Sequence, residues 1–196
     1  MMRMRRNLPV ALMALLVHGC AETGATRSNE SIEIKDAGES YSLSVPVSRL
    51  TMTLPKGNWS RVVKSTGGST DNPRYFYFED KKEASLILSG WFEPDRLFTG
   101  TRDLWEKDTQ SWKKRGLPEP GNVAFERVGR WDTVMYDHPF GKAVNSHIRA
   151  HWVQSGTWID LHISTTTFKS SAENRRKLRS VLGGISISER GASAPR

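Results

Sequence analysis

The stretch that decides the fold is NSHIRAHWVQSGTWIDLHIST, residues 145–165. Apolar and polar residues alternate on both sides of Ser155-Gly156, which is the pattern of two half-buried strands. A two-residue connection that contains glycine is typical of a tight hairpin turn. If Gln154 pairs with Thr157, the antiparallel register of the whole hairpin follows from that one pair.

This register sorts the hairpin into an apolar face and a polar face. The apolar pairs across the two strands are Trp152 with Ile159, Ala150 with Leu161, and Ile148 with Ile163. On the polar face His151 lies opposite Asp160, and Arg149 lies opposite His162. The hairpin therefore predicts an antiparallel sheet that buries one side.

The polar face is the one cluster with a potential for chemistry, and its members are His147, Arg149, His151, Asp160 and His162. Two histidines four residues apart on a strand are separated by about 13 Å, too far to share a metal ion. His151 can approach Asp160 or the diagonal His162, which would allow a metal site or a general-base dyad. The other interpretation is a solvated or helix-facing polar surface with a cross-strand ion pair, and Arg149 between the histidines favours it. We therefore expect no catalytic residue, metal or cofactor.

The N-terminal residues 1–19 predict a signal peptide. Basic MMRMRR precedes a short apolar run over residues 8–17, which is too short to span a bilayer. The following LVHGC resembles the lipobox of bacterial lipoproteins, with Gly19 directly before Cys20, the only cysteine of the chain. The resemblance implies that Cys20 is the acylated first residue of the mature protein, carrying palmitate-type chains. Ala21 after it implies the outer membrane, and the alternative is an ordinary signal peptide with a chance cysteine.

The rest of the chain predicts one α+β domain. Residues 20–30 are small and polar and predict a flexible tether, residues 31–188 form the domain, and residues 189–196 predict a disordered tail. Strands are expected at 31–37, 41–47, 49–54, 59–64, 74–79, 84–92, 122–127, 131–136 and 185–187, beside the hairpin. Helices are expected at 101–115, capped by Thr99 or Thr101, and at 172–182, capped by Ser170 or Ser171. Together they predict an antiparallel sheet of about six or more strands flanked by two helices.

Three local patterns refine this expectation. Pro46 suggests that its strand lies at a sheet edge, and residues 137–142, DHPFGK, predict a loop. Tyr75 and Tyr77 alternate with Phe76 and Phe78, which predicts a sheet covered on both sides at that point.

The charge pattern sets further limits. Arg3, Arg5 and Arg6, in the predicted signal peptide, contribute to the formal net charge of +8. The rest shows no basic stripe or known module for nucleic acid, so we expect no nucleic-acid partner. The basic residues of the second helix could meet lipid headgroups or an acidic partner, although a solvated outer face is the simpler reading; they are Arg175, Arg176, Lys177 and Arg179. The acidic residues of the first helix are expected on a solvated surface; they are Asp103, Glu106 and Asp108.

The order of motifs resembles the PsbP/Mog1/DcrB-like superfamily. The motifs are TMTLPKGNW at 51–59, a tryptophan-bearing helix, HIRAHWVQSGTWIDLHIS at 147–164 and LGGISIS at 182–188. The resemblance implies an antiparallel sheet flanked by helices, in proteins that are mostly non-enzymatic binding or assembly factors.

These expectations combine into a membrane-anchored periplasmic lipoprotein that binds another protein and is not an enzyme. Some such lipoproteins are similar to immunity proteins that neutralise secreted toxins, which is one specific form of this expectation. Two alternatives stay open: an envelope structural or lipid-contacting lipoprotein, and a metal-dependent hydrolase that uses the polar face of the hairpin.

Overall fold

The computed structural model describes residues 31–62, 72–83 and 85–190. The predicted signal peptide, Cys20, the tether and most of the predicted tail lie outside these ranges. The elements are β1 (Glu33–Asp36), β2 (Ser40–Ser44), β3 (Leu50–Pro55), β4 (Trp59–Arg61), β5 (Tyr75–Asp80), β6 (Ile87–Pro94), the 3-10 helix η3 (Asp95–Leu97), α1 (Thr101–Lys114), β7 (Gly121–Val128), β8 (Trp131–Phe140), β9 (Ala143–Gln154), β10 (Thr157–Thr167), α2 (Ser171–Gly183) and β11 (Ser186–Glu189).

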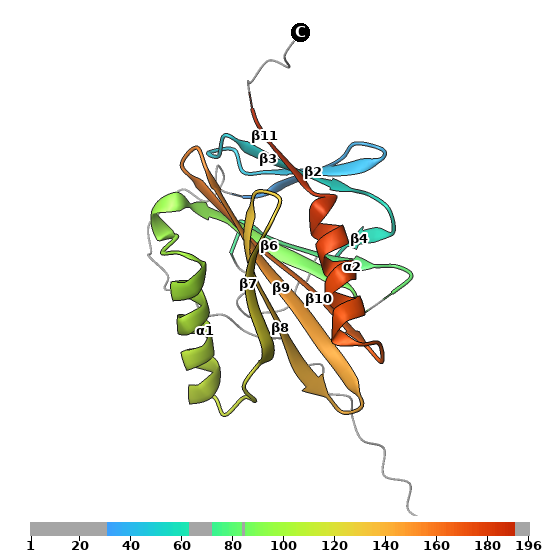
Figure 1. The fold of residues 1–196 in the computed structure, drawn as a ribbon. Helices are drawn as coiled ribbons and strands as arrows, with labels where there is room; N and C mark the ends of the chain where they lie inside the picture. The colour runs from blue at the N-terminus through green and yellow to red at the C-terminus, as the bar shows by residue number, and fades with distance from the viewer. Residues whose placement is uncertain (1–30, 63–71, 84, 191–196) are drawn as a thin grey trace, which may run out of the picture.

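The strands form two antiparallel sheets rather than one. A small sheet has the order β1-β2-β3-β11, and a large sheet of seven strands has the order β4-β5-β6-β10-β9-β8-β7. The α+β class is confirmed, and the large sheet lies between two helices (Figure 1).

The hairpin of β9 and β10 has the predicted register at every pair. Gln154 pairs with Thr157, His151 with Asp160, and Arg149 with His162. The turn residues Ser155 and Gly156 have φ values of 50° and 78°, as expected for a two-residue turn that matches the twist of its strands. Because β10 also pairs with β6, the hairpin lies in the middle of the large sheet.

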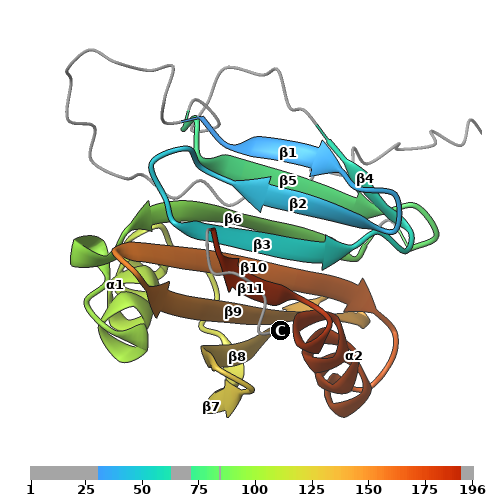
Figure 2. The ribbon, with the colours of Figure 1, turned by 90° about the horizontal axis from the view of Figure 1, so that it is seen from above.

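The two faces of the large sheet are covered differently. Its apolar face packs against the small sheet and α2, whose Leu178 and Leu182 are fully buried in the common core. Figure 2 shows α2 continuing directly into β11, so helix and small sheet lie next to each other. The opposite face meets α1, where Trp112 packs on Tyr136 with ring centroids 5.4 Å apart.

Three predicted boundaries are wrong. Residues 137–140, predicted as loop, continue β8, and only Gly141 and Lys142 form the turn to β9. Pro46 does not mark an edge strand, because β2 ends at Ser44 and lies between β1 and β3. The final strand β11 reaches Glu189, inside the predicted tail.

The helix caps agree with the sequence in one case and not in the other. Ser170 caps α2 in a capping box with Glu173, as the sequence predicts. The N-cap of α1 is Gly100 without a side-chain bond, so the predicted threonine cap is wrong. The Thr99 hydroxyl binds the side chain of Asp103 instead.

Strand β7 closes the large sheet at one edge. Its pairing with β8 shifts register between Gly121 and Ala124, and Asn122 there has a φ of 53°. The Asn122 carbonyl accepts a hydrogen bond from the guanidinium of Arg175 on α2. The edge is therefore irregular and partly occupied by side chains.

Candidate functional site

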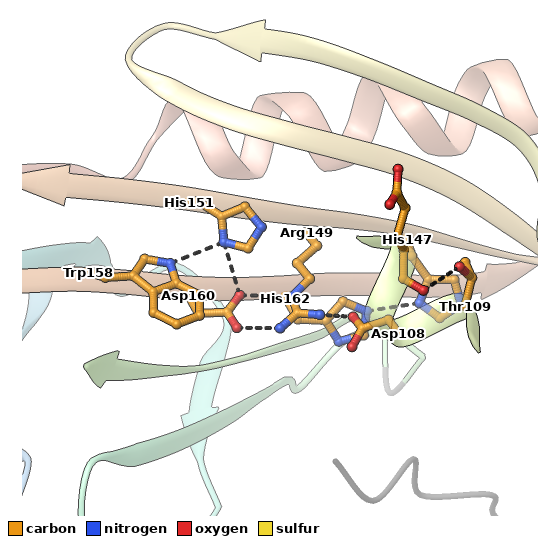
Figure 3. Close-up of polar contacts among 9 residues, drawn as sticks. Asp108, Thr109, His147, Arg149, His151, Trp158, Asp160 and His162 are labelled. Atoms are coloured by element: carbon orange, nitrogen blue, oxygen red, sulfur yellow. Dashed lines mark hydrogen bonds and ion pairs between the residues drawn. The ribbon is translucent and has the colours of Figure 1, made fainter. Parts of the chain in front are cut away.

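The polar face of the hairpin forms a buried layer against α1, whose Asp108 lies next to Arg149 in Figure 3. The exposed fraction is 2% for His147, 2% for His151 and 4% for Asp160. The helix-facing interpretation of this surface agrees with the structure, and the solvated one is wrong.

Arg149 lies at the centre of this layer. Its Nη2 donates to Asp160 Oδ2 at 2.6 Å and its Nε donates to Asp160 Oδ1 at 3.0 Å, a two-pronged ion pair between neighbouring strands. A second carboxylate, Asp108 of α1, accepts from Nη1 of the same guanidinium (Figure 3). The expectation that Asp108 is solvated is therefore wrong, because this residue lies on the packing stripe of the helix.

The ion pair fixes the charge state of Asp160. Burial raises the pKa of this carboxyl, but the charge of Arg149 and its hydrogen bonds outweigh burial and hold the pKa below the usual value. Asp160 is thus a carboxylate at neutral pH. Each of its two oxygens accepts a hydrogen bond from the guanidinium of Arg149.

His151 is held at the edge of the same cluster. Its Nδ1 lies 3.2 Å from the indole Nε1 of Trp158, which donates to it, and 3.4 Å from Asp160 Oδ1. The ring of Phe98 packs beside it, with centroids 5.4 Å apart. Burial lowers the pKa of His151 to about 4, so the imidazole is neutral at pH 7. Since Nδ1 accepts, we assign the ring proton to the buried Nε2, which has no hydrogen-bond partner among the residues that the structure describes.

The other two histidines form a stacked column with a tyrosine. His147 Nδ1 and His162 Nε2 are 3.0 Å apart, and their rings are inclined by only 7°. Tyr136 stacks on the other side of His147 at 4.6 Å, also at 7°. Burial lowers the pKa of His162 to about 4 and that of His147 well below its ordinary value. The diagonal partner of His162 is therefore His147 and not His151.

The charged and aromatic groups of this layer bind and pack against one another. Asp160 is bound by Arg149, and the histidines are neutral and packed against other rings. In the ranges that the structure describes, no group of three or more His, Cys, Asp or Glu residues is arranged to hold a metal ion.

The basic residues predicted on α2 are mostly paired within the domain. Arg175 binds Asp137 at 3.2 Å, Arg179 binds Glu126 through two bonds of 2.7 and 2.9 Å, and Lys177 binds Glu83. Arg176 is exposed. The α2 surface is therefore a poor candidate for a lipid-contacting face.

A second cluster lies on β5 and β6, away from α1, and the sequence pattern singles out two of its members, Tyr75 and Tyr77, but not Trp91. Tyr75 and Tyr77 of β5 and Trp91 of β6 are half-buried and adjacent, and we refer to these three residues as the aromatic patch. The Tyr75 ring lies 5.0 Å from Trp91 and 6.5 Å from Tyr77. The prediction of a sheet covered on both sides is met in full on the side of Phe76 and Phe78, which are in the core, and in part on the side of Tyr75 and Tyr77, which are half-buried. The alternation of RYFYFE was the available signal.

The comparisons with known proteins add little to this geometry. No family model matches the chain, and no curated protein matches it. Among solved structures, it is similar to a protein of Bacteroides thetaiotaomicron VPI-5482 determined at 1.50 Å resolution, with 11% identity and a TM-score of 0.43. The match covers 75% of this chain and 48% of that one, so this chain spans about half the length of that protein.

One further finding concerns membranes. Among the described residues, neither helix is both long and apolar enough to cross a bilayer.

Proposed function

We propose that this protein is a periplasmic lipoprotein, anchored through Cys20, whose α+β domain binds another protein and performs no catalysis. The observation that carries the binding role is the aromatic patch. The lipobox-like LVHGC at residues 16–20 supports the anchor, and Ala21 supports the outer membrane as its location.

The aromatic patch has the composition of a protein-binding surface. Tyrosine and tryptophan are enriched in interfaces because they offer large, rigid contact areas together with a polar tip. At its margin Arg74 and Glu93 form an ion pair of 3.3 Å, with Asn72 also bonded to Glu93. A half-buried aromatic centre with a polar margin is the usual anatomy of such a site.

The buried polar layer supports a non-enzymatic role. A catalytic base or nucleophile needs a free atom within reach of a substrate. Here Asp160 is bound by Arg149, while His147 and His162 face each other through ring nitrogens 3.0 Å apart. The layer instead joins α1 to the sheet.

The PsbP/Mog1/DcrB-like resemblance is consistent with this proposal and narrows the class of partner. Members of that superfamily are mostly binding or assembly factors, and similar lipoproteins include immunity proteins. A secreted toxin is therefore the partner class that we would look for first.

The binding role is tested by capture of partners from membranes with the full lipidated chain, read by quantitative mass spectrometry. A stoichiometric protein that is retained by the wild type should be lost with Trp91→Ser or Tyr77→Ser. Val47→Ser, on the β2–β3 connection and 64% exposed, is the matched control and should retain it. Equal capture by all variants would remove the aromatic patch from the proposal.

The anchor is tested separately. Cys20→Ser should move the protein from the membrane fraction to the soluble fraction and abolish incorporation of a palmitate analogue. An unchanged distribution together with unchanged labelling would contradict lipidation at this residue.

A further inference from the structure

Four connections of the chain meet at one end of the large sheet, which we name the basic end. They are the β5–β6 turn, the C-terminal turn of α1, the β8–β9 turn and the β10–α2 connection. In Figure 1 the last three lie in the lower part of the view, and the β5–β6 turn lies at the right. The ring contact of Trp112 with His138, at 5.5 Å, brings the end of α1 next to the end of β8.

Two strongly exposed phenylalanines project from the basic end. Phe140 ends β8 and is 60% exposed, and Phe168 follows β10 and is 86% exposed. Phe140 of β8 pairs with Ala143 of β9, and Thr167 of β10 pairs with Val144, the residue after Ala143. Phe168 follows Thr167, so Phe140 and Phe168 lie at the same height along the neighbouring strand β9. They are separated by one intervening strand, or about 10 Å. Within the described ranges they are the only aromatic residues among the exposed large hydrophobic ones.

The connections at this end carry many exposed basic residues. The exposed basic residues of this end are Lys81, Lys82, Lys113, Lys114, Arg115, Lys142 and Lys169. The exposed carboxylates there are Glu119 and Glu173, and Glu173 is engaged in the cap of α2. Glu83 and Asp80 are partly buried; Glu83 binds Lys177, and Asp80 accepts from the backbone amides of residues 82 and 83. The positive charge therefore dominates the surface that carries the phenylalanines.

A pocket lies between α2 and the β10–α2 connection. It has a volume of about 380 Å³ and is open to solvent, and its lining includes Lys169, Arg176 and Lys177 together with Glu83 and Glu173. Arg176 has an exposed side chain, so it can contact an anionic group at the pocket mouth. The space is sufficient for a phosphate-bearing headgroup.

We propose that the basic end binds the surface of an anionic phospholipid bilayer. Phe140 and Phe168 enter the boundary between headgroups and acyl chains, while Lys142 and Lys169 meet lipid phosphates. Exposed aromatic rings flanked by lysines are the combination that interfacial binding uses. A bilayer fits better than a protein, because Phe168 has almost no surrounding protein surface that could exclude water from a protein interface.

This proposal goes beyond the protein-binding function and does not depend on it. It also moves the main lipid contact from the α2 surface expected from sequence to the ends of the strands, and of that surface it uses the exposed Arg176. The two proposals concern different surfaces, because the aromatic patch lies on β5 and β6 rather than at the sheet end.

The test uses the full chain with Cys20→Ser, so that no lipid anchor contributes. Phe168→Cys carrying an environment-sensitive fluorophore reports local insertion, and Val47→Cys with the same fluorophore is the matched control on the β2–β3 connection. The probe is a vesicle of equal parts phosphatidylcholine and phosphatidylglycerol, compared with pure phosphatidylcholine.

The expected result is a blue shift at position 168, with anionic vesicles only, that disappears at high salt. Adding Lys142→Gln and Lys169→Gln should weaken this binding about thirtyfold, since each lysine near an anionic surface contributes about 1 kcal/mol. Lys35→Gln with Arg61→Gln, which removes two charges elsewhere, should leave it unchanged.

No fluorescence shift at position 168, an equal shift at position 47, or equal losses of binding in both double variants would overturn the proposal. Unchanged thermal unfolding of each variant shows that the fold is intact.

Discussion

At the scale of single residues, Arg149 is a buried charge held from two sides. Its side chain is 14% exposed and binds carboxylates from two elements, Asp160 of β10 and Asp108 of α1. Taking one partner from a buried ion pair leaves the other charge desolvated without full compensation, which costs more than an exposed pair would.

Asp160→Asn should therefore lower the free energy of unfolding by about 3 kcal/mol at pH 7. Urea denaturation monitored by tryptophan fluorescence measures the change. Asp132→Asn is the matched control, because its pair with Arg127 is exposed (52% and 68%) and should contribute about 0.5 kcal/mol. Similar values for the two variants would show that Arg149 is not held as described.

Gly90 supplies a second prediction at this scale. A Cβ at this position would lie 2.3 Å from the backbone oxygen of Asp160 and 2.8 Å from Phe76 Cζ. Both neighbours are fixed, so Gly90→Ala must separate β6 from β10 or displace a core ring, at a cost of about 3 kcal/mol. Gly183→Ala, with nothing within 4 Å, should be neutral or stabilising. Thermal unfolding of the two variants compares these costs directly.

The sequence predicts the membership of the polar layer but not its partners. Alternation within the hairpin is local, so it placed His151 opposite Asp160 correctly. The contact of Arg149 with Asp108 joins residues 41 positions apart. It depends on how α1 docks, which no local pattern encodes, although Asp108 lies on the same helical face as Trp105 and Trp112.

At the scale of elements, the capping box of α2 is a local device with a measurable contribution. Ser170 Oγ accepts from the Glu173 amide at 3.3 Å, and the Ser170 amide donates to Glu173 Oε2 at 3.2 Å. Ser170→Ala should lower stability by about 1 kcal/mol. Ser180→Ala, on the exposed side of the same helix, should have little effect. Chemical denaturation measures the free energy of unfolding of both variants. Equal values for the two would mean that the capping box does not stabilise the domain.

Elements defined by their own turns were predictable, and those defined by distant contacts were not. The two-residue turn at Ser155-Gly156 fixes the register of β9 and β10. The end of β8 was missed because Pro139 and Gly141 are typical of loops, whereas the pairing of β8 with the long strand β9 extends it to Phe140. The place of β11 in the small sheet depends on its pairing with β3, which joins residues from opposite ends of the domain.

At the scale of the whole molecule, the buried histidines link stability to pH. Burial lowers the pKa of His151 and His162 to about 4 from the ordinary 6.5. Between these two values the unfolded chain binds more protons than the folded one, so stability falls as pH falls. The pKa of Asp160 is also lowered, so protonation of this carboxylate adds a further loss of stability when the pH falls below 3.8, the ordinary pKa of an aspartate.

Stability should therefore be highest near neutral pH and decline as pH falls from about 6.5 towards 4, by at most about 1.4 kcal/mol per pH unit for each histidine. Urea denaturation across this interval measures the slope. His151→Gln removes one titrating group and should make the slope shallower, while His138, which is less buried, contributes less. A flat profile in the wild type would contradict neutral buried histidines.

The irregular edge of β7 has a consequence for the behaviour of many copies together. An open, regular edge would offer a row of main-chain donors and acceptors to a strand of another copy, and sheets can polymerise in this way. Here the register shift at Gly121–Ala124 interrupts the row, and Arg175 occupies the Asn122 carbonyl. The large sheet therefore resists growth at this edge, and the domain can be crowded on a surface without self-assembly into fibres through β7.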